Sequence, residues 1–77
     1  MGKFAKLFDL EGGEQVLVIK NEDDECVLNV STHFEGVIAT IKLTIKDESS
    51  VDSEIESFDY EKAVVFRGII QKVIKGE

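Results

Sequence analysis

The chain has 77 residues, a net charge of −7 and 43% hydrophobic residues, which predicts one small globular domain over residues 1–77 and excludes a disordered chain. Its single cysteine excludes an internal disulfide, and no apolar run approaches the roughly 20 residues that a membrane-spanning helix needs. The N-terminus also lacks the apolar run of a secretory signal, so we expect a cytoplasmic protein with no membrane partner.

The N-terminal part of the chain predicts a β-hairpin. Residues 3–10 and 15–20 have the composition of two strands, and the Gly-Gly pair at 12–13 accepts the positive φ angles of a tight turn. A two-residue turn would place Phe8 opposite Leu17 on one face of the hairpin. A three-residue turn would change that register, and the sequence leaves both turns open.

A second hairpin over residues 25–34 and 37–46 has the clearest pattern in the chain. With Glu35-Gly36 as its turn, one side of the hairpin is almost entirely apolar, because side chains alternate between the two faces of a strand. The facing pairs on that side are Phe34 with Val37, Thr32 with Ala39, Val30 with Ile41, Leu28 with Leu43 and Cys26 with Ile45. A one-residue slip would turn this apolar set toward water, so the turn and the pattern specify the same register.

A short polar connection joins the two predicted hairpins. If Lys20 pairs with Glu25, the side of the second strand that carries Leu17 and Ile19 joins the apolar face of the second hairpin. Sequential strands joined by short loops are usually neighbours, so we expect an antiparallel meander in the order 1-2-3-4.

Residues 47–61 hold the whole net charge of the protein. This segment has seven acids and no Lys or Arg, whereas the rest of the chain has nine acids and nine bases. Its apolar residues fit both helical and strand spacing, so residues 49–58 stay open between a loop, a short helix and a fifth strand. We interpret 47–58 as an irregular acidic connection whose Phe58 is tucked into the core.

The last segment, residues 60–75, predicts an α-helix. Asp59 is a suitable N-cap, and Glu61 lies in the first turn, where a negative charge interacts favourably with the helix dipole. One apolar arc recurs with a period of 3.6 residues. It consists of Ala63, Phe66, Ile69, Ile70, Val73 and Ile74.

These elements predict an α+β fold with two layers. A four-stranded antiparallel meander forms one layer, and a single C-terminal helix packs its apolar arc on one face of the sheet. The expected core face of the sheet carries Phe8, Leu17, Ile19, Leu28, Val30, Phe34, Ile41, Leu43 and Ile45.

The residues that usually carry chemistry do not form a catalytic or metal-binding pattern. The one histidine, His33, is expected on the side of the sheet away from the core, and no nucleophile motif surrounds any serine or Cys26. Cys26 is expected on the core side of its strand, where a free cysteine acts as a small hydrophobe. The acids at 22–25 lack the spacing of a calcium loop. We therefore expect no enzyme activity, no catalytic residue, no metal and no cofactor.

The back of the sheet is the first candidate interaction surface. Under the registers above, five apolar side chains point away from the helix and form a patch of a size that often marks an interface. They are Leu7, Val16, Val18, Val27 and Ile38. The leading function is thus a non-enzymatic interaction module that self-associates through this face, as a homodimer or with an unidentified protein partner.

The acidic segment is the second candidate surface. Its expected docking residues are Asp47, Glu48, Asp52, Glu54 and Glu56. Direct nucleic-acid binding is disfavoured because phosphates need a basic surface, whereas a basic protein would be attracted. The alternative function is therefore an acidic inhibitor or nucleic-acid mimic, and a ligand-binding or catalytic domain is the third and least favoured class.

Overall fold

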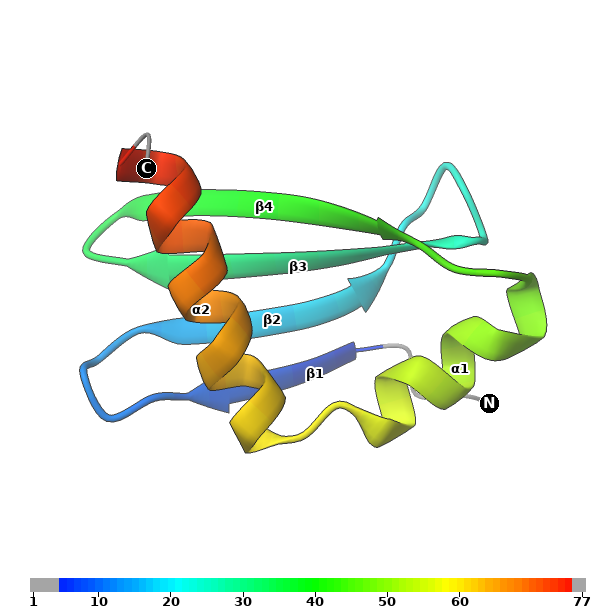
Figure 1. Cartoon of the computed structure of the whole chain (residues 1–77), viewed down its shortest axis with the longest axis horizontal. Helices are drawn as coiled ribbons and strands as arrows, with labels where there is room; N and C mark the ends of the chain where they lie inside the picture. The colour runs from blue at the N-terminus through cyan, green and yellow to red at the C-terminus, as the bar shows by residue number, and fades with distance from the viewer. Residues whose placement is uncertain (1–4, 76–77) are drawn as a thin grey trace.

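The computed structural model describes residues 5–75, which form one open antiparallel sheet and two helices (Figure 1). The strands are neighbours in chain order, as expected for a meander of order 1-2-3-4. They are β1 (Ala5–Asp9), β2 (Gln15–Lys20), β3 (Val27–Phe34) and β4 (Val37–Thr44), followed by the helices α1 (Glu48–Ser57) and α2 (Tyr60–Lys75). The α+β class is confirmed, but the prediction of a single helix is wrong. Residues 3 and 4 of the predicted first strand lie outside the described residues.

The β3–β4 hairpin has the predicted register throughout. Glu35 and Gly36 form its turn with φ angles of 50° and 81°, the two positive values of a type I′ turn, which matches the twist of the flanking strands. Every predicted pair from Phe34–Val37 to Leu28–Leu43 is present. Beyond the strands, the backbone N–H of Ile45 donates to the carbonyl of Cys26 at 2.6 Å.

The β1–β2 hairpin uses the three-residue turn rather than the two-residue turn. Leu10 N–H donates to the carbonyl of Glu14 at 2.8 Å, and Gly13, with φ 95°, donates to the carbonyl of Leu10 at 3.1 Å. This adds one residue to the turn and places Phe8 opposite Val16. The expected pairing of Phe8 with Leu17 is therefore wrong.

The β2–β3 register differs from the prediction by three residues. Lys20 lies opposite Leu28 instead of Glu25, because the connection is longer than expected: Asp24 accepts the backbone N–H of Cys26 through its side chain at 2.9 Å and holds that segment as a turn. An odd shift exchanges the two faces of a strand.

The exchange of faces on β2 corrects the predicted patch and the predicted core together. Val16 and Val18 have 0% exposure and belong to the core, so their expected place on the back of the sheet is wrong. Leu17 and Ile19, which were expected in the core, lie on the opposite face instead.

Residues 48–57 are helical, which corrects the prediction of an irregular acidic connection. Asp47 is the N-cap of α1: its carboxylate accepts the backbone N–H of Ser50 at 2.8 Å and the hydroxyl of Ser49 at 2.7 Å. Val51 and Ile55 lie one turn apart on the buried side of α1. The expectation that the residue after α1, Phe58, is tucked into the core is confirmed.

Hydrogen bonds from Lys6 connect the C-terminal end of α1 to β1. The ammonium group of Lys6 donates to the carbonyls of Glu56 at 2.7 Å and Phe58 at 3.1 Å, which are carbonyls that a helix end leaves without an internal partner. The ring of Phe58 lies between those of Phe8 and Phe66, with centroid distances of 5.8 and 5.5 Å. These contacts place the α1–α2 junction over the outer strand of the sheet.

The helix α2 starts at the predicted N-cap, since Asp59 accepts the backbone N–H of Lys62 at 2.9 Å. Ala63 and Ile70 are buried, as expected from the apolar arc. The arc fails in the second half of α2, where Ile69, Val73 and Ile74 are exposed. The reason is visible in Figure 1: α2 crosses the sheet from β1 toward β4, and its C-terminal end passes the edge of β4.

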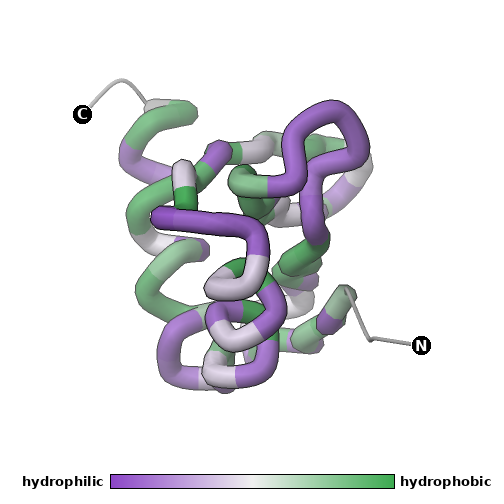
Figure 2. Tube along the Cα trace, turned by 90° about the vertical axis from the view of Figure 1, so that its right-hand side faces the viewer, coloured by the Kyte–Doolittle hydropathy of each residue, from purple (hydrophilic) through white to green (hydrophobic). Residues whose placement is uncertain are grey.

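The core forms between one face of the sheet and both helices. Its buried members come from the β1–β2 turn, β2, β3, α1, the α1–α2 junction and α2, and they are Leu10, Val16, Val18, Leu28, Val30, Val51, Ile55, Phe58, Ala63 and Ile70. Figure 2 shows hydrophilic residues along α1 and in the β2–β3 connection, at the end of the molecule away from the two hairpin turns. Within residues 5–75, neither helix is long and apolar enough to cross a membrane.

Candidate interaction surface

The face of the sheet opposite the helices is left open by the described residues, and we call it the helix-free face. Side chains that lie opposite each other on antiparallel strands share a face, so the registers order it in three rows across the strands. The rows are Ala5–Ile19–Asn29–Lys42, Leu7–Leu17–Ser31–Thr40 and Asp9–Gln15–His33–Ile38, with Val27 and Thr44 beyond the first row.

The apolar side chains of this face gather on β1 and β2. Leu7 and Ile19 are exposed and occupy neighbouring rows, with half-buried Leu17 between them. Ile38 is 64% exposed on β4, at the far corner of the face. An exposed cluster of this kind is a common mark of a contact surface.

Of the five residues predicted for this face, the structure places three on it. Leu7, Val27 and Ile38 lie there, whereas Val16 and Val18 are buried under the helices. The prediction missed Leu17 and Ile19. Choosing the three-residue turn at 11–13 would have predicted both residues, because that turn places Leu17 and Ile19 on the open side of the first hairpin.

The helix-free face is close to neutral in an acidic protein. Asp9 is its single acid and Lys42 its single base among the described strand residues, so the charge of −7 arises elsewhere on the chain. Neighbouring polar groups also satisfy each other. Gln15 donates to the Asp9 carboxylate at 2.7 Å, and Thr40 donates to the Ser31 hydroxyl at 3.1 Å.

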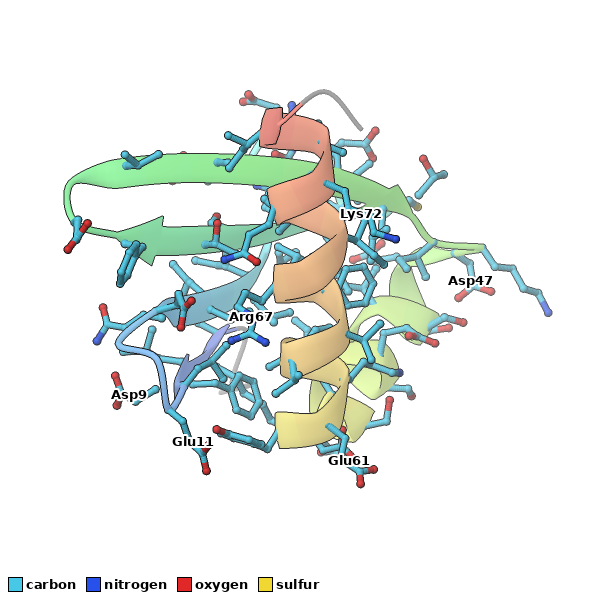
Figure 3. The ribbon with its side chains drawn as sticks, turned by 60° about the vertical axis from the view of Figure 1, so that its left-hand side comes forward. Asp9, Glu11, Asp47, Glu61, Arg67 and Lys72 are labelled. Atoms are coloured by element: carbon cyan, nitrogen blue, oxygen red, sulfur yellow. The ribbon has the colours of Figure 1, made fainter. Side chains whose placement is uncertain are left out.

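Four of the five acidic docking residues lie on α1, and the fifth, Asp47, is its N-cap. Glu48, Asp52 and Glu56 are exposed at i, i+4 and i+8, which places them in a row with about 6 Å between neighbours. Glu54 is exposed on another side of the helix. Asp47 is engaged as the N-cap at the start of α1 (Figure 3), and the hydrogen bonds from Ser49 and Ser50 lower its pKa.

A pocket of about 220 Å³ lies between the β3–β4 turn and the second half of α2. Its lining residues are Glu14, Thr32, Phe34, Glu35, Val37, Gln71 and Ile74. Glu14 contacts Arg67 at 3.5 Å and Gln71 at 3.5 Å, distances too long for strong hydrogen bonds. Figure 3 shows Arg67 on the side of α2 that faces the β1–β2 turn, where it pairs with Glu14, the more buried of the two carboxylates that line this pocket.

The remaining candidates for chemistry are isolated from one another. His33 is half-buried on the helix-free face, and Cys26 is a half-buried free thiol just before β3. In the part of the chain that the structure describes, no three His, Cys, Asp or Glu side chains come together as metal ligands would.

Comparison with known proteins leaves the surfaces of the chain as the basis for a functional argument. No protein-family model, no curated protein and no solved structure matches this chain. The function therefore has to be argued from the helix-free face, the acidic row on α1 and the pocket beside α2.

Proposed function

We propose that this protein is a non-enzymatic interaction module that binds a second copy of itself through the helix-free face. The observation that carries the proposal is the apolar cluster of exposed Leu7 and Ile19 with half-buried Leu17, on the face of the sheet that the helices do not cover. Isolated apolar residues are ordinary on a protein surface, but neighbours on two strands form a continuous patch.

The charge of the face supports a second copy as the partner. Two molecules that each carry −7 repel one another on average, but the helix-free face adds no net charge to that repulsion because Asp9 and Lys42 cancel. Open antiparallel sheets commonly pack face to face at about 10 Å, with interdigitating side chains. Small domains also gain stability from association, since their own cores are limited.

The proposal predicts a specific effect of Leu7→Lys. Leu7 is 57% exposed, so a lysine there leaves the monomer folded, but it places two ammonium groups in the self-contact. A matched control is Val65→Lys on α2, where the exposure is 58% and the side chain lies on the other layer. Light scattering across a concentration series should show weaker association for Leu7→Lys alone. Equal association of the two variants would contradict the proposal.

A second candidate function is supported by the acidic row on α1. Glu48, Asp52 and Glu56 present three carboxylates at helical spacing, which suits docking on a basic protein surface as an inhibitor or nucleic-acid mimic would. A poly-lysine peptide is the probe, and binding should weaken steeply with salt. Asp52→Asn should then weaken binding more than Glu22→Gln, which removes the same charge from the exposed β2–β3 loop. Equal effects would indicate net charge alone.

A further inference from the structure

The outer strand β4 is a free edge with an incompletely covered apolar side. Its helix side carries four apolar residues, Val37, Ala39, Ile41 and Leu43, followed by Ile45 just beyond the strand, and none of them is fully buried. The other edge differs: β1 spans Ala5–Asp9, and its Lys6 is occupied at the end of α1. A long, flat edge with apolar side chains is a template for pairing with another strand.

The second half of α2 presents an apolar stripe beside this edge. Ile69, Val73 and Ile74 are exposed, with Val73 at 64%, although their spacing is that of a core face. Ile74 and Val37 line the same pocket, which places the end of α2 next to the start of β4. Figure 1 shows this end reaching past the strand. The last turn of α2, which carries Val73 and Ile74, therefore lies at this edge of the sheet.

The hydrogen-bond pattern determines which backbone groups β4 offers. Ile45 N–H bonds to the carbonyl of Cys26, so Cys26–Ile45 is a hydrogen-bonded pair, and such pairs alternate with open pairs along an antiparallel ladder. The residues of the open pairs point their N–H and C=O groups away from β3. On β4 these residues are Ile38, Thr40, Lys42 and Thr44.

We infer that β4 pairs antiparallel with β4 of a second copy, about a two-fold axis at Ile41, and joins the two sheets into one. In this register the outward backbone groups of Thr40 meet those of Lys42 in the second copy, as ladder geometry requires. On the helix side, Ile41 faces Ile41 of the second copy, Ala39 faces Leu43 of the second copy, and Val37 faces Ile45 of the second copy. Every contact on that side is apolar.

Charge and strand length favour this register over the two registers that are shifted by two residues. A shift of two residues in one direction places Lys42 opposite Lys42 of the second copy, and like charges directly opposite are unfavourable. A shift in the other direction leaves Thr44 and Ile45 without partners. In the inferred register, Lys46 comes opposite the turn residue Gly36 and beside the acid Glu35, so two opposite-charge contacts form at the ends of the paired strands.

The two-fold symmetry also explains the overhanging end of α2. The helix crosses β4 near the β3–β4 turn (Figure 1), and in the second copy the strand runs in the opposite direction. The end of each α2 therefore lies over Leu43 and Ile45 of the other copy, which α2 of their own chain leaves partly open.

The side of the molecule that β4 borders limits the size of this contact. The extents are 32 × 23 × 20 Å, and this side spans the longest and the shortest of them. A contact along one strand and the end of one helix covers part of that side, so it lies at the small end of the range for specific interfaces, whose standard size is about 800 Å² per partner.

This contact is independent of the helix-free face, because the two contacts use different surfaces of the chain. The test uses light scattering on the full chain, whose monomer mass is 8.6 kDa. In the Leu7→Lys background, which disables the helix-free face, we expect a dimer of twice that mass. A monomer there overturns the β4 inference. In the Val73→Lys background the β4 contact is disabled, and a monomer there contradicts the helix-free contact instead.

Matched variants separate the contact from folding. Val73→Lys should raise the dissociation constant of the β4 dimer at least about tenfold, whereas Val65→Lys, two turns earlier on α2, should leave it unchanged. Thr40→Pro removes an outward N–H without breaking the β3–β4 ladder and should also abolish the dimer. Independently of any variant, amide exchange at Thr40 and Lys42 should slow as concentration rises. Concentration-independent exchange at these amides would refute the paired edge.

Discussion

The substitution of Val18 by Lys tests the face assignment of β2, on which both the core and the helix-free face depend. Val18 is fully buried, and the next residue on the same strand, Ile19, is exposed on the opposite face. Both variants place a lysine on the same central strand, one on each face, so the difference between their stabilities tests which face of β2 is buried.

The expected loss of stability at Val18 is comparable with the whole stability of the domain. Replacing a buried valine forfeits about 2 kcal/mol of apolar burial, and an unpaired ammonium group in the core adds several kcal/mol. A chain of 77 residues has a total stability of about 4–12 kcal/mol. Val18→Lys should therefore be largely unfolded, whereas Ile19→Lys should stay folded. The milder Val18→Ala should cost about 2–3 kcal/mol through lost burial and the cavity left behind.

Circular dichroism at low protein concentration measures the free energy of unfolding by urea titration and the Tm by heating. Val18→Ala should lower the Tm by roughly 10–20 °C, because 1 kcal/mol corresponds to about 4–8 °C for a domain of this size. If Ile19→Lys unfolds the protein while Val18→Lys does not, the faces of β2 are reversed and the account of the helix-free face given above is wrong.

Four further outcomes follow from single contacts. Asp59→Ala removes the N-cap of α2 and should cost about 1 kcal/mol in urea titrations, whereas Asp59→Asn should cost little. Lys6→Met removes the donor at the end of α1 and should cost about 1 kcal/mol, with a matching loss of helical signal. Glu35→Asn should raise the stability by about 0.5 kcal/mol, because Asn accepts the positive φ of this type I′ turn more readily than Glu. The pKa of Asp47 is lowered by Ser49 and Ser50, so the stability that its carboxylate contributes is present at neutral pH and lost as the pH falls through the lowered pKa. The stability difference between the wild type and Asp47→Asn should therefore shrink in acid, and a difference that stays constant with pH would contradict this role.

Local sequence was sufficient for the β3–β4 hairpin. Its apolar alternation and its turn at Glu35-Gly36 require the same register, and a slip by one residue would expose the whole apolar side. The N-cap Asp59 and the start of α2 were likewise predictable, because a cap and its first turn involve residues only three or four apart.

The predictions for β2 and α1 were wrong because the hydrophobic pattern of each segment fits two structures. Both faces of β2 are apolar, with Val16 and Val18 on one and Leu17 and Ile19 on the other, so alternation could not choose the core side. The choice depended on the lengths of the two flanking connections. The helix α1 was missed because Val51, Ile55 and Phe58 fit helical spacing while alternate positions also fit a strand, and because most of its residues are polar.

The sequence by itself determined the elements whose signals are short-range, namely the β3–β4 hairpin, the order of the strands and the helix that begins after Asp59. Only the tertiary structure decided which side of β2 is buried, because that depends on how the β1–β2 turn and the β2–β3 connection close. It also decided which residues of the apolar arc on α2 are buried and which are exposed. Ala63 and Ile70 are buried because the sheet lies beneath them, while Val73 is exposed because the helix runs past β4. Periodicity reveals that a face is apolar, but the length of the sheet beneath the helix determines how much of that face is left for a partner.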